Sequence, residues 1–234
     1  METEMGKSKR RRLNAELADV QVSNGIYAKY IKRLIDIVVS FLALVLTFPI
    51  NVVIGVITFF DVGSPVFFRQ KRVGRNLEEF TIIKFRNMRN TCDKNGILLP
   101  PDKRVTHFGK FVRKTSLDEL LNFWSVLKGD MSLIGPRPLL TEYIPYYTER
   151  QLMRHAVRPG LECPSLVKRD YSRSWREQFE DDVWYVENIS FLTDCRMIWS
   201  LIKLIFDKNE LKRRSGALRG RFDDECEAKK KYAV

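Results

Sequence analysis

Residues 37–60 read IVVSFLALVLTFPINVVIGVITFF, a run of 24 positions without a charged side chain. Asp36 and Asp61 bound this run on its two sides. In a helix, about 20 apolar residues are enough to cross the roughly 30 Å hydrocarbon core of a bilayer. The sequence therefore predicts one membrane helix, and length alone favours a single-pass anchor.

Pro49 divides the run into two halves, each too short to cross a bilayer by itself. Proline removes a backbone donor and bends a helix, and Asn51 and Gly55 follow within two turns. Basic residues flank the run on both sides: Lys29, Lys32 and Arg33 before it, and Arg69, Lys71, Arg72 and Arg75 after it. Because Lys and Arg collect on the cytoplasmic side of a membrane, a re-entrant helix with both ends in the cytoplasm competes with the single-pass anchor.

The composition points to anionic partners. The 234 residues carry a formal net charge of +12, and the pI is about 9.6. Acidic lipid and phosphorylated substrates suit such a surface, whereas we expect no nucleic-acid partner because zinc-finger, RNP and helix-turn-helix patterns are not found. The cysteines form no C-x-x-C pair, and neither His107 nor His155 has a zinc-ligand spacing from a cysteine. We therefore expect reduced thiols and no zinc site.

Outside the apolar run, three segments have a secondary-structure signature. Residues 66–88 read VFFRQKRVGRNLEEFTIIKFRNM, which predicts two short strands around a Gly-Arg-Asn turn, with Lys84 and Arg86 on one strand face. Ser116 followed by Glu119 resembles a capping box and predicts a helix that begins at Ser116. Residues 191–206 have an apolar stripe at helical spacing, which favours a core-facing helix and leaves an interfacial membrane helix as the alternative.

Two short patterns could carry chemistry. Asp118 and Glu119 are adjacent carboxylates in the expected first helical turn, where the helix dipole would favour their ionised forms; simple helix capping is the competing interpretation. Further along, residues 129–138 read GDMSLIGPRP, so that prolines stand on both sides of Arg137. A stiff backbone would present this guanidinium in a way that suits phosphate binding.

Four stretches together resemble the bacterial sugar transferase family, the small monotopic phosphoglycosyl transferases. They are KFRNM at 84–88, TSLDELLNFWSVLKGDMSLIGPRPLL at 115–140, RHAVRPG at 154–160 and FEDDVWYVEN at 179–188. The similarity extends from about Tyr30 to Phe206. It implies an α/β, membrane-associated monotopic fold with one re-entrant helix broken at Pro49, interfacial amphipathic helices and a small sheet.

The resemblance also implies an activity: transfer of a sugar 1-phosphate from a UDP-sugar to polyprenol (undecaprenol) phosphate, with release of UMP. Asp118 would be the nucleophile that forms a covalent aspartyl-phosphosugar, and Glu119 would be a catalytic residue and the Mg²⁺ ligand. Lys84, Arg137 and Asp182 would bind substrate. Such enzymes initiate exopolysaccharide, capsule, O-antigen or glycoprotein glycan assembly at the bacterial inner membrane, with the catalytic domain facing the cytoplasm.

Four segments follow from this interpretation: a basic polar arm at 1–28, the membrane helix at 29–62, a cytoplasmic catalytic domain at 63–206 and a charged tail at 207–234. Oligomer formation and the identity of the sugar stay open.

The chain departs from the family pattern at two places. Phe48 stands where serine commonly precedes the membrane proline, and the sequence after Gly160 lacks the usual threonine-glycine-tryptophan run. The alternative function is a membrane-anchored basic binding module without catalysis, whose arms adhere to anionic lipid.

Overall fold

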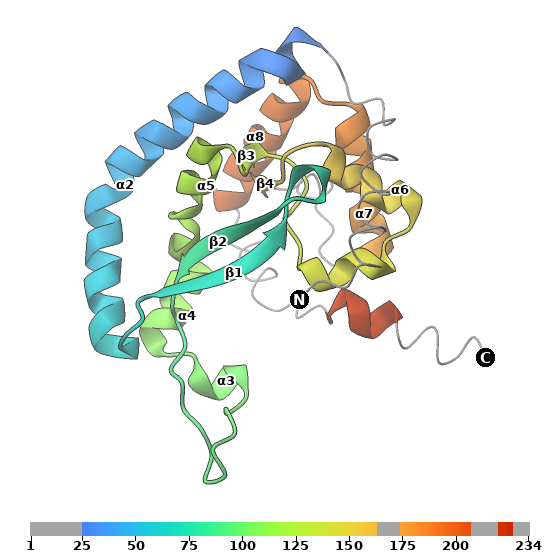
Figure 1. Ribbon diagram of the computed structural model, residues 1–234. Coiled ribbons are helices and arrows are strands. Elements are labelled where there is room, and N and C mark those ends of the chain that lie inside the picture. Colours follow the sequence, from blue (N-terminus) through green and yellow to red (C-terminus); the bar gives the residue numbers. More distant parts are fainter. Residues whose placement is uncertain (1–24, 163–173, 207–219, 227–234) are drawn as a thin grey trace, which may run out of the picture. The chain divides into compact units, whose positions relative to one another are not determined.

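The computed structural model describes residues 25–162, 174–206 and 220–226 (Figure 1). The chain divides into two compact units. The first unit contains residues up to 36, residues 71–80 and residues from 129 onward, and the second contains 37–70 and 81–128. Of the predicted arm at 1–28 and the tail at 207–234, the structure describes residues 25–28 and 220–226.

The apolar run forms one long helix, α2, over Lys32–Val62, preceded by a π-helical turn at Tyr27–Ile31. Pro49 lies inside α2 and does not end it. Figure 1 shows that α2 changes direction about halfway along its length. Next to the proline, Thr47 Oγ1 donates to the carbonyl of Ala43 at 2.7 Å and accepts from Asn51 Nδ2 at 3.2 Å. Thr47 thus supplies a hydroxyl-to-backbone bond one position before Phe48.

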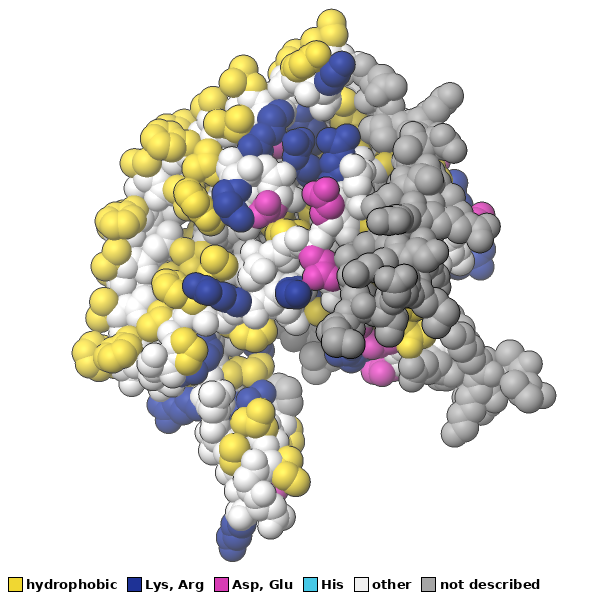
Figure 2. Space-filling model, in the orientation of Figure 1, with side chains coloured by type: hydrophobic (Ala, Val, Ile, Leu, Met, Phe, Trp, Pro, Cys, Tyr) yellow, Lys and Arg dark blue, Asp and Glu magenta, His cyan; other side chains and the backbone are white. Residues whose placement is uncertain are grey.

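The outward side of α2 is apolar. Its exposed large side chains include Leu34, Val38, Phe41, Leu42, Val45, Leu46, Phe48, Val53 and Phe60, and Figure 2 shows hydrophobic side chains along the helix. Asp36, Ser40 and Thr58, by contrast, are buried. This is the inverse of a water-soluble helix, and a patch of this kind marks contact with lipid or a partner. By length and composition α2 could cross a membrane.

A β-hairpin follows α2, formed by β1 (Phe67–Val73) and β2 (Glu79–Phe85). A 3₁₀ turn at Arg75–Leu77 joins the strands, with Asn76 at φ 52° and Leu77 at φ 60°. The two strands predicted around the Gly-Arg-Asn turn are therefore confirmed. The tip of the hairpin belongs to the first unit and its base to the second.

The rest of the second unit consists of short helices: α3 (Pro101–Arg104), α4 (His107–Lys114), the 3₁₀ helix Leu117–Glu119 and α5 (Asn122–Lys128). The capping box predicted at Ser116 is wrong. Ser116 has φ 55°, in the left-handed region, and its side chain makes no capping bond. Its backbone N–H instead donates to Arg113 O at 3.2 Å, so that Ser116 closes the turn after α4 rather than starting a regular helix.

The first unit contains two parallel strands, β3 (Ser132–Ile134) and β4 (Gly160–Glu162), which pair Ser132 with Gly160. Three helical segments lie between them: the 3₁₀ helix Thr141–Tyr146, α6 (Glu149–Leu152) and the 3₁₀ helix Met153–Ala156. The helices α7 (Trp175–Glu187) and α8 (Phe191–Phe206) complete the unit. The mixed helix and small-sheet composition confirms the coarse fold prediction.

Three apolar clusters form the core of the described part of the first unit. They contain Val73, Leu77 and Leu152; Ile134, Tyr185, Ile189 and Met197; and Leu139, Tyr143, Phe179 and Phe222. The helix predicted at 191–206 is confirmed as α8, but the favoured core-facing interpretation is wrong. Phe191, Ile198 and Trp199 of the predicted stripe are exposed, whereas Thr193, Asp194 and Met197 are buried.

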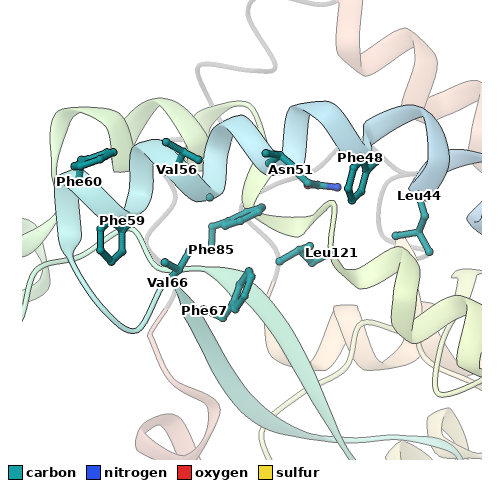
Figure 3. A pocket seen from close by; sticks show the side chains of 12 residues that line it. Leu44, Phe48, Asn51, Val56, Phe59, Phe60, Val66, Phe67, Phe85 and Leu121 are labelled. Atoms are coloured by element: carbon teal, nitrogen blue, oxygen red, sulfur yellow. The ribbon is translucent and has the colours of Figure 1, made fainter.

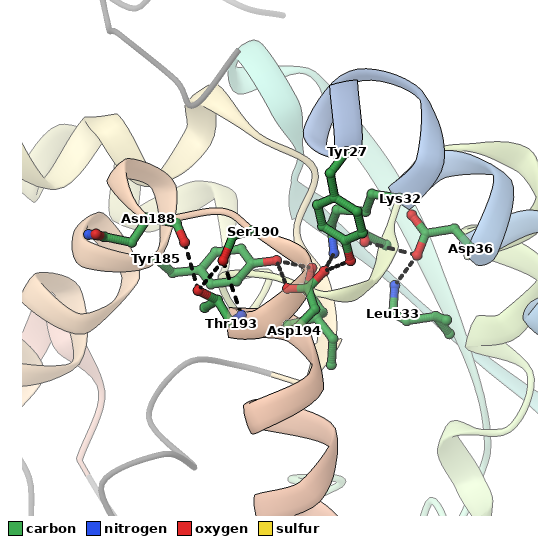
Figure 4. Close-up of polar contacts among 11 residues, drawn as sticks. Tyr27, Lys32, Asp36, Leu133, Tyr185, Asn188, Ser190, Thr193 and Asp194 are labelled. Carbon is green, nitrogen blue, oxygen red and sulfur yellow. Dashed lines mark hydrogen bonds and ion pairs between the residues drawn. The ribbon is translucent and has the colours of Figure 1, made fainter. Parts of the chain in front are cut away.

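Asp194 joins the start of α2 to α8 (Figure 4). Its carboxylate lies 2.6 Å from Lys32 Nζ and accepts the hydroxyls of Tyr27 at 2.6 Å and Tyr185 at 2.7 Å. Asp36 also accepts from the backbone N–H of Leu133 at 3.0 Å. Removing one member would leave another polar group buried without its partner, so this network fixes the first turns of α2 in the first unit.

Candidate active site

Asp118, Glu119 and Lys84 lie together in the second unit. The 3₁₀ helix Leu117–Glu119 carries the two carboxylates, and Lys84 comes from the penultimate position of β2. Lys84 Nζ lies 2.6 Å from Glu119 Oε1, with both side chains partly exposed. Asp118 is only 7% exposed. The predicted nucleophile is therefore sheltered beside a solvent-accessible ion pair.

Burial determines the acidity of Asp118. Desolvation raises the pKa of its carboxyl group, Lys84 opposes that rise, and the negative charge of Glu119 adds to it. Backbone hydrogen bonding at Asp118 lowers this pKa, in the direction expected for the start of a helix, but desolvation outweighs it. The result is a carboxylate more basic than an ordinary aspartate.

Arginines that follow β2 hold the end of α2. The guanidinium of Arg86 donates to the carbonyls of Val62, of Gly63 at 2.8 Å and of Ser64 at 3.3 Å. Arg89 adds a bond to the carboxylate of Asp61 at 2.9 Å. Cations suit the carbonyl end of a helix. The strand that presents Lys84 is therefore tied to the end of the apolar helix, a role that sequence reasoning did not assign to Arg86 or Arg89.

An apolar cavity of about 640 Å³ lies in the same unit (Figure 3). It is bounded by α2 from Leu44 to Phe60, by the base of the hairpin and by Leu121, three residues after Asp118. Phe85, the neighbour of Lys84, also lines it. Asn51 is the polar side chain in this lining, and its Oδ1 is buried with no hydrogen-bond partner among the described residues. The cavity suits a hydrocarbon chain rather than a sugar or nucleotide.

Arg137 and Asp182 lie in the first unit and are connected through Arg154. Arg137 is exposed, and its carbonyl oxygen accepts from Arg154 Nη2 at 2.7 Å. Arg154 also pairs with Asp182 at 2.7 Å, and both side chains of this pair are fully buried. Asp182 thus reaches the Arg137 loop only indirectly. Sequence reasoning included Arg154 in a family motif but gave it no role, and a lone arginine offers no sign that it is buried.

The donor set fits a metal shared with substrate better than one enclosed by protein. The described residues contain no group of three or more His, Cys, Asp or Glu side chains that could hold a metal ion. Mg²⁺ in phosphoryl-transfer sites is commonly held by one or two carboxylates together with substrate phosphates. Asp118 and Glu119 are such a pair, although Lys84 occupies one oxygen of Glu119.

Comparisons with known proteins give the family. Residues 27–208 match the bacterial sugar transferase family. The "Uncharacterized sugar transferase EpsL" of Bacillus subtilis is 42% identical over 175 residues, which cover 75% of this chain and 87% of the relative. The UDP-N-acetylgalactosamine-undecaprenyl-phosphate N-acetylgalactosaminephosphotransferase of Aeromonas hydrophila is 35% identical over 216 residues, 87% of this chain and 50% of the relative.

A third relative is the UDP-glucose:undecaprenyl-phosphate glucose-1-phosphate transferase of Klebsiella pneumoniae, 36% identical over 193 residues. The match covers 78% of this chain and 40% of the relative, so the chain spans half or less of the two relatives named for a specific sugar. These matches confirm the family resemblance that the four sequence motifs predicted. The chain belongs to the bacterial sugar transferase family.

Proposed function

We propose that this chain transfers a sugar 1-phosphate from a UDP-sugar to undecaprenol phosphate and releases UMP. The observation that carries the proposal is the sheltered carboxylate of Asp118 beside the Lys84–Glu119 pair. The names of the relatives from Aeromonas hydrophila and Klebsiella pneumoniae support the reaction class, and differ in the sugar. The sugar for this chain therefore stays unassigned.

In the first step, a carboxylate oxygen of Asp118 attacks the β-phosphorus of the UDP-sugar. The bond between that phosphorus and the bridging oxygen breaks, and UMP leaves with the electron pair. The raised pKa of Asp118 makes its carboxylate a better nucleophile than an exposed aspartate, and water is largely kept from the resulting acyl phosphate by burial.

In the second step, a phosphate oxygen of undecaprenol phosphate attacks the same phosphorus. The bond to Asp118 breaks, the carboxylate is restored, and a lipid diphosphate sugar forms. Lys84 neutralises charge near Asp118. Arg137, whose backbone carbonyl is held by Arg154 in the first unit, is the phosphate-binding residue that the family resemblance implies. Mg²⁺, held by Glu119 and substrate oxygens, would supply further charge neutralisation when bound.

The acceptor is a long isoprenoid, and two features of the second unit suit it. The exposed apolar side of α2 fits a lipid environment, and the apolar cavity beside Leu121 and Phe85 fits hydrocarbon next to the reacting phosphate. We propose that α2 enters the inner membrane as a re-entrant helix bent near Pro49, with Asp118 on the cytoplasmic side. Exopolysaccharide assembly is a candidate pathway, since a relative from Rhizobium leguminosarum is named an exopolysaccharide production protein.

The test is UMP release by the detergent-solubilised full chain, measured for a panel of UDP-sugars with and without undecaprenol phosphate. We expect one or a few UDP-sugars to yield UMP, and the Asp118→Asn variant to yield none. A membrane-anchored binding module would release no UMP from any donor. Full turnover by Asp118→Asn would rule out the covalent mechanism through Asp118, and the family assignment would still hold.

A further inference from the structure

Two arginines of the first unit lie at Gly129, three positions before β3, and a third lies near one of them. Arg158 Nε donates to the carbonyl oxygen of Gly129 at 2.9 Å. Gly129 has φ +103°, and a Cβ atom built on it would stand 3.3 Å from Arg33 Nη2. Arg33 and Arg158 therefore approach the same glycine. Arg75, at the hairpin turn, is close enough to Arg158 to act on its charge. We call Arg33, Arg75 and Arg158 the arginine cluster.

The arginine cluster places three positive charges in one region of the first unit, with Asp36 as a counter-charge to Arg33 and Arg158. Burial lowers the pKa of Arg158, and repulsion from Arg33 and then from Arg75 lowers it further. Asp36 acts in the opposite direction, but its carboxylate also accepts bonds from Ser132 Oγ at 3.1 Å and from the Leu133 N–H. Like charges brought together in this way favour binding of an anion that bridges them.

The surface next to the arginine cluster is apolar. On the helical segment that carries Arg33, the exposed side chains include Ile26, Tyr30, Ile31 and Leu34. Figure 2 shows a group of Lys and Arg side chains beside hydrophobic side chains at the start of α2. Guanidinium groups bordering an exposed apolar helix are in the setting where the headgroups of a bilayer lie.

We propose that the arginine cluster binds the phosphate of an anionic membrane lipid at the start of α2. Guanidinium groups match phosphate oxygens in bidentate geometry and hold them more strongly than ammonium groups do. A nucleotide sugar offers the same phosphate chemistry, but it has no hydrocarbon to cover Ile26, Tyr30 and Leu34. The inference rests on the membrane attachment in the proposed function and is independent of the transfer chemistry.

The experiment uses native mass spectrometry of the full chain in detergent, titrated with phosphatidylglycerol or with phosphatidylcholine. We expect the chain to retain phosphatidylglycerol preferentially. Each arginine near a membrane surface contributes about fivefold to the binding of anionic lipid, so we expect Arg33→Gln/Arg158→Gln to weaken phosphatidylglycerol binding by roughly 30-fold. The charge-preserving pair Arg33→Lys/Arg158→Lys should bind phosphatidylglycerol more weakly than the unmodified chain and more strongly than the glutamine pair.

Two single variants guard against loss of folding. Arg75→Gln, in the exposed hairpin turn, should weaken binding by about fivefold without touching Gly129. Arg176→Gln removes the same charge from an exposed position on α7 and should leave the lipid affinity unchanged. If Arg75→Gln and Arg176→Gln weaken phosphatidylglycerol binding equally, the effect comes from net charge alone and the proposal is wrong.

A parallel assay separates lipid from substrate. The KM for the UDP-sugar should not change in Arg75→Gln. If that KM rises while phosphatidylglycerol retention stays as in the unmodified chain, the arginine cluster binds substrate phosphate and the lipid proposal is wrong. If the unmodified chain releases no UMP but retains phosphatidylglycerol through these arginines, the proposed function fails and the lipid site stands.

Discussion

The two units each contain a short acid–base ion pair, and the pairs differ in their surroundings. Lys84 and Glu119 are 2.6 Å apart, with side chains 21% and 32% exposed. Arg154 and Asp182 are 2.7 Å apart, with side chains 1% and 0% exposed. In the first pair, Lys84 can bind a phosphate in place of Glu119, and Glu119 can bind a metal ion in place of Lys84. The second cannot do so without paying a large desolvation cost.

The position of a charged residue in a motif does not by itself reveal its function. Asp118 and Asp182 both stand in family motifs, and both are buried carboxylates. Asp118 lies beside the partly exposed Lys84–Glu119 pair, which we propose contacts the substrate phosphate. Asp182 faces Arg154, which in turn holds the carbonyl of Arg137. We therefore propose that Asp182 positions the Arg137 loop, and its direct contact with substrate stays a prediction.

The largest expected effect is on folding, from breaking the buried pair. Arg154→Met leaves the carboxylate of Asp182 uncompensated, which typically costs about 3–5 kcal/mol. The measurement is thermal unfolding of the full chain in detergent. The matched control is Arg150→Met, four residues earlier, whose half-exposed pair with Glu180 should contribute about 1 kcal/mol or less.

The double variant Arg154→Met/Asp182→Leu removes both charges and should recover much of the lost stability. If Arg154→Met unfolds at the same temperature as Arg150→Met, the contrast between a structural pair and a surface pair is wrong.

The next effect is on catalysis, from breaking the exposed pair. Glu119→Gln and Lys84→Met should each lower UMP release by about 10²-fold, since each removes a group that we propose acts on the transferring phosphate. Their stability should change by only about 1 kcal/mol or less, because partly exposed pairs contribute little. Loss of stability equal to that of Arg154→Met would mean that this pair is structural as well.

The smallest effect is on pH dependence. The pKa of Asp118 is raised, so the folded chain holds that proton at pH values where an unfolded aspartate, with a pKa near 3.9, has released it. Burying the carboxylate therefore lowers stability as pH rises through this window. Asp118→Asn should be more stable than the unmodified chain near neutral pH and equal to it at about pH 4 or below. Thermal unfolding as a function of pH measures this difference.

The acid side of the UMP-release profile provides an independent check on the same groups. Lys84 lowers the pKa of Asp118 and Glu119 raises it. Lys84→Met should therefore move the loss of activity to higher pH, and Glu119→Gln should move it to lower pH. Shifts in the same direction in both variants would argue that Asp118 is not the group that titrates.

Much of the fold could be predicted from local patterns. The apolar run gave the long helix α2, and alternation around the Gly-Arg-Asn turn gave the hairpin. The apolar stripe at 191–206 predicted the helix α8 correctly. It did not predict that the stripe would be exposed, since apolar spacing is the same on a helix that faces a protein core and on one that faces lipid. The capping-box prediction at Ser116 failed because the backbone of Ser116 takes part in the turn that ends α4. The preceding helix, rather than the local capping pattern, determines its conformation.

Less of the candidate site could be predicted. The motif brought Asp118 and Glu119 together, and the family resemblance included Lys84; the structure shows that Lys84 pairs with Glu119, 35 positions further along the chain. The burial that raises the pKa of Asp118 depends on packing, and no local residue pattern reports it. The link from Asp182 through Arg154 to Arg137 joins three separate segments, so it required the structure.

The measurement that tests the central claim most directly is mapping of the covalent intermediate. The full chain is incubated with a UDP-sugar that yields UMP, quenched without undecaprenol phosphate, digested and analysed by mass spectrometry. We predict a phosphosugar on Asp118 that disappears when undecaprenol phosphate is added. A phosphosugar on another residue, or UMP release into the lipid product with no modified peptide, would contradict the account.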